Sequence, residues 1–223
     1  IIIMPIIPKF KTIFIHIPKC AGTSVEKVLI DYQLDRKTFK ADLQKWWGNL
    51  NTTHGKYELD HSTFSYLQNN CKNYNPQFFK FCVVRNPYSR LVSEFHHCKK
   101  KGSRFVKNFT DFKSFVYFIR DNFEFILNNE EKNHHIVSHY IPQYKFVYID
   151  GVCKMDYVMK FEKINKDWEI LCKKLKINRK LIKDGTYSSG KKYNYNEYYD
   201  DELRNIVYNL YKEDFELFNY PKK

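Results

Sequence analysis

The segment over residues 12–30 constrains this chain most, because its pattern is that of a strand, a short loop and the start of a helix. The β-branched and aromatic run TIFIHI (12–17) predicts a buried strand, which Pro18 ends because proline cannot extend a central strand. Apolar residues then repeat at helical spacing over 25–29. Between the two, Gly22 permits a tight turn of the backbone.

This loop predicts an anion-binding site. Backbone N–H groups at a helix N-terminus point outward, and the positive end of the helix dipole favours a phosphate. Lys19 adds a full charge, and Thr23 and Ser24 add hydroxyl donors, either of which can also cap the helix. The loop is not a Walker A motif, since its lysine precedes the only glycine, which disfavours a magnesium-dependent kinase. The simpler alternative is an ordinary strand-to-helix turn with a surface lysine.

A second strand-like run, FKFCVV (79–84), leads directly into Arg85. Pro87 follows where a helix can begin, because its missing N–H is no loss in the first turn. Ser93 comes two helical turns after Arg85. Such an arginine and serine could hold one phosphate from two sides, the arginine in a bidentate manner.

Together these two stretches resemble the cofactor signatures of sulfotransferases, in particular the carbohydrate (Golgi-type) group that includes the heparan sulfate 2-O- and 6-O-enzymes. Later parts of the chain are similar to further blocks of that group. The segments that carry the resemblance are 16–24, 84–93, 139–144, 157–162 and 211–220.

The resemblance implies a cofactor, 3′-phosphoadenosine 5′-phosphosulfate (PAPS), with PAP as its product and no metal. Arg85 and Ser93 would hold the 3′-phosphate. Lys191 and Lys192 match the place where the family closes a loop over the 3′-phosphate and adenine, although a basic loop tip is also a common solvated feature. The residues implied for the 5′-phosphosulfate are Lys19, Cys20, Ala21, Gly22, Thr23 and Ser24.

The implied reaction needs a group that offsets charge on the leaving oxygen and a general base for the acceptor hydroxyl. Lys19 suits the first role. His61 is the expected base, because histidine titrates near neutral pH and a catalytic histidine occupies this place in the 2-O-sulfotransferases that the sequence resembles. Its alternative role is a surface or helix-capping histidine. Candidates for the base or for substrate contact near His61 are His54, Glu58 and Asp60.

Two further residues have competing interpretations. Gln143, in a block resembling the family's His…Pro-Gln, either contacts substrate, orients the site or makes a loop hydrogen bond. Arg90 is expected on the outer face of its helix, away from the site.

Strand and helix patterns alternate along the chain, which indicates an α/β fold with a P-loop-like central parallel sheet and helices on both faces. Ligands in such sheets bind at the carboxyl ends of the strands, where both cofactor loops begin. We expect a tail over 1–11 and a single sulfotransferase domain over 12–220. Beyond those named above, the expected elements are a strand at 157–161 and helices near 62–67, 104–130, 165–175 and 201–215.

The net charge of +13 favours an acidic partner, such as an acidic glycan or a cofactor with several negative charges. The lysines are scattered and no nucleic-acid-binding module stands out. The six cysteines show no metal-binding spacing, and a disulfide between distant positions stays open. Clustered histidines, including His139, are read as surface residues rather than metal ligands.

The apolar run at 1–7 is too short to cross a membrane and does not have the form of a signal peptide. We therefore expect either a cytoplasmic protein or the trimmed luminal domain of a Golgi-type enzyme. The sequence favours sulfuryl transfer to a hydroxyl, on a carbohydrate. The alternatives are a P-loop-like ATP-dependent kinase and a non-catalytic basic protein that binds polyanions.

Overall fold

The computed structural model describes most of the chain, and the statements below concern these residues: 6–29, 61–71, 74–102, 105–106, 109–130, 137–181 and 193–222. The chain divides into two compact units. The first unit contains Ile1–Val84 and Lys145–Asp184, and the second contains Arg85–Tyr144 and Gly185–Lys223. The single domain expected over 12–220 stays a prediction.

The first unit is built on a sheet with the strand order β1-β2-β3-β6. β1 runs antiparallel to β2, whereas β2, β3 and β6 are parallel to one another. Because parallel neighbours point the same way, the carboxyl ends of these three strands lie at one edge of the sheet. The strands are β1 (Ile6–Ile7), β2 (Thr12–Ile15), β3 (Phe79–Val84) and β6 (Tyr157–Lys160).

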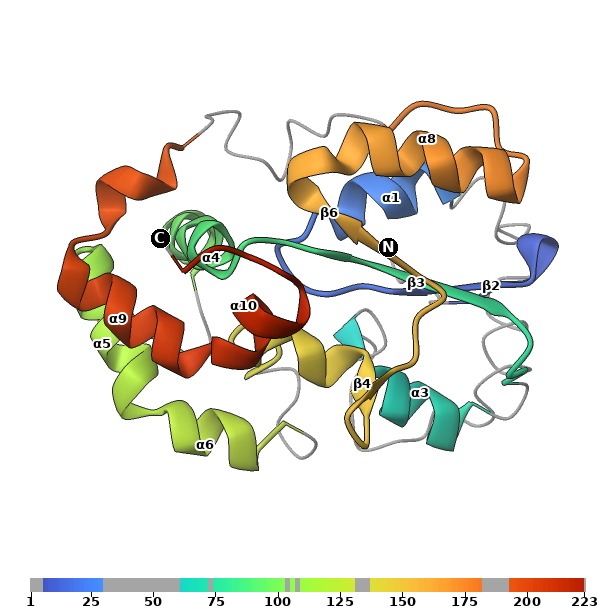
Figure 1. Ribbon diagram of the computed structural model, residues 1–223. Helices are drawn as coiled ribbons and strands as arrows, with labels where there is room; N and C mark the ends of the chain where they lie inside the picture. The colour runs from blue at the N-terminus through green and yellow to red at the C-terminus, as the bar shows by residue number, and fades with distance from the viewer. Residues whose placement is uncertain are drawn as a thin grey trace. The chain divides into compact units, whose positions relative to one another are not determined.

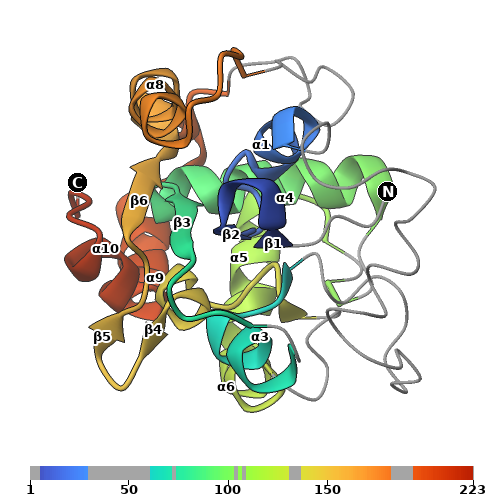
Figure 2. The same ribbon diagram turned by 90° about the vertical axis from the view of Figure 1, so that its right-hand side faces the viewer.

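Helices cover both faces of this sheet, as the alternating pattern predicts. In Figures 1 and 2, α1 (Gly22–Leu29) and α8 (Ile164–Leu175) lie on one face and α3 (Phe64–Asn70) on the other. The expected α/β fold with a central parallel sheet is therefore confirmed. The strand expected over 12–17 ends two residues early, so His16 belongs to the loop that follows β2.

The remaining elements of the first unit are short. A hairpin of β4 and β5, which the sequence analysis missed, turns at Asp150 and Gly151, both of which have positive φ angles. The short elements are η1 (Pro8–Phe10), β4 (Tyr148–Ile149), β5 (Val152–Cys153) and η5 (Phe161–Lys163).

The second unit is helical and has an aromatic core. The ring of Phe95 lies 5.4 Å from that of Phe112 and 5.6 Å from that of Phe115, centroid to centroid. The helical stretch expected over 104–130 forms two helices, as does the helix expected over 201–215. The helices are α4 (Pro87–Lys101), α5 (Phe112–Asp121), α6 (Phe123–Asn128), η6 (Tyr195–Tyr198), α9 (Asp201–Leu210) and α10 (Lys212–Leu217). The short helix η4 (Gln143–Phe146) spans the junction of the two units.

Two general properties of the described residues bear on the sequence expectations. Across these ranges, no helix is both long and apolar enough to cross a bilayer. All six cysteines fall within them, and none forms a disulfide. Cys82 is fully buried in β3, and this burial raises the pKa of its thiol.

Candidate functional site

The loop between β2 and α1 has an uncommon backbone. Lys19 (φ 68°) and Ala21 (φ 64°) both adopt the left-handed conformation, which is unfavourable by roughly 1–2 kcal/mol for a residue with a Cβ atom. Turns of this kind point successive main-chain N–H groups in one direction and form anion-binding concavities. The side chain of Lys19 is half-buried. The loop thus combines main-chain donors, a lysine and the N-terminus of α1.

The start of α1 differs from the sequence expectation in two respects. The helix begins at Gly22, so Thr23 and Ser24 lie inside its first turn and do not cap it. The N–H of Ser24 instead donates to the carbonyl of Ala21 at 3.0 Å. Gly22 itself is helical, and the left-handed residues of the turn precede it, so the predicted turn at Gly22 is wrong.

Gly22 is required for a different reason, which is the ring of His16. A Cβ atom at position 22 would lie 2.6 Å from Cγ of His16 and closer still to two other ring atoms. The ring therefore occupies the space that any other residue at this position would need. Nδ1 of His16 lies 2.7 Å from Oε1 of Glu26, whose side chain is only 8% exposed.

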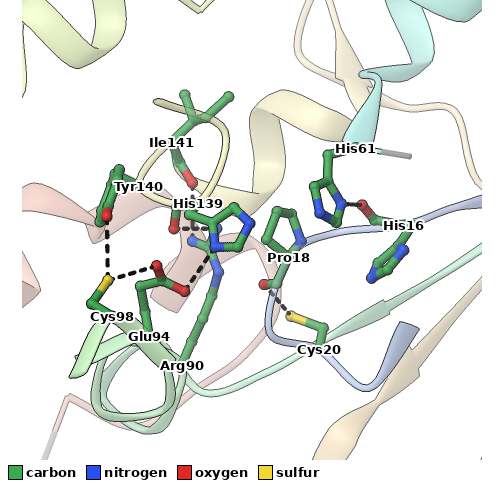
Figure 3. A network of polar contacts seen from close by, with 10 residues as sticks. All are labelled: His16, Pro18, Cys20, His61, Arg90, Glu94, Cys98, His139, Tyr140 and Ile141. Carbon is green, nitrogen blue, oxygen red and sulfur yellow. Dashed lines mark hydrogen bonds and ion pairs between the residues drawn. The ribbon is translucent and has the colours of Figure 1, made fainter. Parts of the chain in front are cut away.

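The structure brings His61 to the same loop, within the first unit. Its Nδ1 lies 3.3 Å from the carbonyl oxygen of His16, and the two rings meet edge to face with centroids 4.5 Å apart (Figure 3). A carbonyl can only accept a hydrogen bond, so we assign Nδ1 of His61 as the donor, and in the neutral ring the lone pair then lies on Nε2. Thr63 then caps α3 by accepting from the N–H of Tyr66 at 3.2 Å.

Cys20 is positioned with its side chain inward. It is 1% exposed, and its Sγ donates to the carbonyl of Pro18 at 3.5 Å (Figure 3). The thiol of Cys20 is therefore directed away from solvent.

Arg85 begins the second unit, directly after β3. Asn86 caps α4 by accepting from the N–H of Tyr88 at 2.9 Å, and Pro87 is the first helical residue, which confirms the predicted helix start. Nε of Arg85 donates to Oγ of Ser89 at 2.8 Å. Ser93 lies two turns along α4 and is partly exposed.

Gln143 binds the main chain of Arg85. Its Oε1 accepts from the Arg85 N–H and its Nε2 donates to the Arg85 carbonyl, each at 2.8 Å. Gln143 is fully buried, so these contacts favour the orienting role over substrate contact. Sequence spacing could not show this pairing, because the two residues lie 58 positions apart.

Asp214 anchors Gln143 in turn. Its carboxylate accepts from the N–H groups of Gln143 and Tyr144, each at 2.8 Å, and from Nε2 of Gln143 at 3.3 Å. Burial raises the pKa of Asp214 to about 6, although Arg90 and these hydrogen bonds act in the opposite direction.

The expected exposure of Arg90 is wrong. Arg90 is 4% exposed, and its guanidinium donates to the carbonyls of Ile141 at 2.9 Å and His139 at 3.2 Å (Figure 3). It points inward because these carbonyls come from an irregular segment and need donors. Arg90 therefore fixes the segment that carries His139 and Gln143.

The same segment carries His139, which the sequence predicts to be a surface residue. In the structure a buried carboxylate holds this histidine. Nδ1 of His139 lies 2.7 Å from Oε2 of Glu94, with the two side chains 25% and 3% exposed. The other oxygen of Glu94 accepts from Sγ of Cys98 at 3.1 Å (Figure 3). A carboxylate on one ring nitrogen fixes the orientation of an imidazole.

Several predicted residues lie outside the described ranges. These are His54, Glu58, Asp60, Lys191 and Lys192. Among the described side chains, no group of three or more His, Cys, Asp or Glu residues is placed to hold a metal ion.

Comparison with known proteins gives one finding. A family model described as the sulfotransferase family matches residues 4–221, which is nearly the whole chain of 223 residues. The search of curated proteins and the search of solved structures gave no match.

Proposed function

Because the chain belongs to the sulfotransferase family, we propose that it moves the sulfuryl group of PAPS to a hydroxyl of a carbohydrate acceptor. Membership of this family means that the chain is a transferase of sulfuryl groups. The observation that carries the finer proposal is the β2–α1 loop, in which two left-handed residues, Lys19 and Ala21, precede the N-terminus of a helix. The net charge of +13 suits both a polyanionic cofactor and an acidic glycan.

The chemistry of the described residues supports such a cofactor. The loop offers main-chain N–H groups, the hydroxyls of Thr23 and Ser24 and the ammonium of Lys19 for the 5′-phosphosulfate. Arg85 and Ser93 would bind the 3′-phosphate, the arginine through a bidentate pair. PAPS, when bound, supplies an activated sulfuryl group on a phosphate leaving group. Lys191 and Lys192 stay candidates for the loop over the nucleotide.

The residues of the chain then act by position and charge. Lys19 offsets the negative charge that develops on the bridging oxygen as the S–O bond to the phosphate breaks. Nε2 of His61 takes the proton of the acceptor hydroxyl as the new S–O bond forms, because Nδ1 is already a donor to the His16 carbonyl. The proton thus ends on His61, and the sulfuryl group ends on the acceptor oxygen.

Calorimetric titration with PAP, and separately with ATP and magnesium, tests the cofactor. We expect PAP to bind and the Arg85→Ala variant to bind it at least roughly tenfold more weakly, as for a lost charge-assisted hydrogen bond. A response to ATP with magnesium alone would instead support the kinase. Binding of neither nucleotide, together with binding of heparin-like polymers, would support the non-catalytic protein.

Transfer of labelled sulfuryl from PAPS to a panel of glycans, with tyrosine peptides and small phenols for comparison, tests the acceptor. We expect label on glycans, and His61→Ala to bind PAP like the parent protein while losing turnover. Retention of most of the activity by that variant would exclude His61 as the base, and label on the non-glycan compounds alone would overturn the carbohydrate assignment.

A further inference from the structure

His16 makes three connections that no role assigned so far explains. Its ring covers Gly22, its Nδ1 pairs with Glu26 and its carbonyl accepts from His61. We propose that His16 is a positioning residue that joins the β2–α1 loop to His61. The inference rests on the proposed function, in which that loop binds the phosphosulfate and His61 takes the proton.

The contact with Gly22 fixes where α1 begins. Since a Cβ atom at position 22 would lie 2.6 Å or less from three atoms of the His16 ring, the ring and the first residue of the helix are in direct contact. The N–H of Thr23 follows within the same helical turn, whereas that of Ser24 donates to the carbonyl of Ala21. A ring seated on Gly22 therefore sets the direction of this first turn of the helix and of the N–H of Thr23.

The pair with Glu26 fixes the rotation of the ring. Glu26 lies one helical turn after Gly22, so its carboxylate reaches Nδ1 of His16 from the same helix that the ring covers. Both side chains are largely buried, at 11% exposure for His16 and 8% for Glu26. Removal of either partner leaves a buried polar group without this hydrogen bond, which is unfavourable.

The connection to His61 fixes a tautomer. The main chain of His16 lies between β2 and the left-handed residues of the loop, so its carbonyl has a defined direction. That carbonyl holds the proton of His61 on Nδ1, and the two rings meet edge to face with centroids 4.5 Å apart. The same residue thus determines the position of the anion loop and the nitrogen that acts as base.

A double-mutant cycle in thermal unfolding tests the contact without any assumption about function. We expect Gly22→Ala to lower the Tm strongly in the parent protein and only slightly in a His16→Ala background, where the ring is absent. Gly151→Ala is the matched control, because Gly151 also lies in the first unit, has φ +73° and has no atom near its added Cβ. Its shift in Tm should be the same in both backgrounds. Additive effects of Gly22→Ala and His16→Ala would overturn the proposal.

Two further measurements do not depend on the stability of the fold. The first is the tautomer of His61, read from the ¹⁵N NMR shifts of its ring, and the second is the rate of sulfuryl transfer. Glu26→Gln keeps an oxygen for Nδ1 of His16, so we expect it to retain the Nδ1–H form of His61 and most of kcat. Glu26→Leu should yield a mixture of tautomers and lower kcat at least roughly tenfold, as expected when a catalytic group is misplaced. Retention of both properties by Glu26→Leu would also overturn the proposal.

These results separate the two proposals. If the parent protein neither binds PAP nor transfers sulfuryl groups, the proposed function fails, while the unfolding cycle and the His61 tautomer still decide whether His16 joins the loop to His61.

Discussion

Gln143 holds Arg85 by both ends of its side-chain amide, with Oε1 accepting from the Arg85 N–H and Nε2 donating to the Arg85 carbonyl at 2.8 Å each. One amide thereby satisfies the donor and the acceptor of the residue that follows β3, as a neighbouring strand would. The side chain of Arg85 is directed separately, through Ser89. The backbone of the arginine proposed for the 3′-phosphate is thus fixed by a residue that need not touch the ligand.

Replacement of Gln143 by leucine should therefore weaken folding. The change leaves the N–H and carbonyl of Arg85 without these partners in a partly buried place, so we expect the free energy of unfolding to fall by about 2–4 kcal/mol. Urea unfolding measures this, with Gln68→Leu, on an exposed position of α3, as the control. Equal effects of the two substitutions would show that the amide contacts contribute nothing to stability.

Substitution of Arg85 should weaken PAP binding, whereas substitution of Arg90 should lower the stability of the fold. Arg85→Ala removes the arginine proposed for the 3′-phosphate, so we expect PAP affinity to fall about 10- to 100-fold with a small change in Tm. Arg90→Ala removes the donors to two carbonyls, those of His139 and Ile141, and should lower the free energy of unfolding by about 2–4 kcal/mol. Calorimetry and urea unfolding of both variants test the contrast, which an equal loss of stability in the two would contradict.

Glu94 should matter for stability in a way that an exposed glutamate does not. Glu94→Leu removes the contacts of the carboxylate with Nδ1 of His139 and with the thiol of Cys98, and we expect a loss of about 1–3 kcal/mol in the free energy of unfolding. Glu124→Leu, at an exposed position of α6, is the matched control in the same unit. A loss no larger than that of the control would show that the Glu94 contacts are dispensable.

Local signals in the sequence predicted the elements that depend on neighbouring residues. The first turn of α4 follows from Pro87, and the extent of β3 matches the strand-like run over 79–84. The α/β order of the first unit follows from the same patterns. These features are local, because a few neighbouring residues determine where a helix begins or a strand ends.

The contacts that shape the candidate site are not local, and the sequence could not show them. Arg90 was placed outside because an arginine in a helix is usually exposed, yet its partners are carbonyls 49 and 51 positions away. Gly22 was assigned to a turn, since glycine usually serves there, whereas the approach of the His16 ring is visible only in three dimensions. The residue types of the loop can be read from the sequence, but the left-handed conformations of Lys19 and Ala21 are visible only in the structure.

Asp214 should make the stability of the protein depend on pH. Its pKa is raised from 3.8 to about 6 by burial, so between about pH 4 and 6 the folded state holds a proton that the unfolded chain has lost. The contribution of this group to stability is therefore fully present below about pH 4 and is lost as the pH rises through about 6. Asp214→Asn does not titrate, so the stability of the parent protein relative to this variant should increase on acidification from about pH 7 to about pH 4.5. Urea unfolding at several pH values measures the difference. A difference that is constant or decreases on acidification would contradict the raised pKa.

A glycine substitution at Lys19 should separate the effect of the side-chain charge on turnover from the effect of the backbone conformation on stability. Lys19→Gly deletes the ammonium, and glycine adopts φ 68° without a Cβ penalty, so we expect the relief of strain to offset the greater freedom of the unfolded chain and to leave the Tm nearly unchanged. Turnover with PAPS should fall about 100- to 1,000-fold, as for the loss of one group that stabilises charge in the transition state. Lys11→Gly is the matched control, because Lys11 is an exposed lysine of the same unit with φ 50°. It should show the same small change in Tm and full turnover. Equal turnover in the two glycine variants would show that the charge of Lys19 has no part in the transfer.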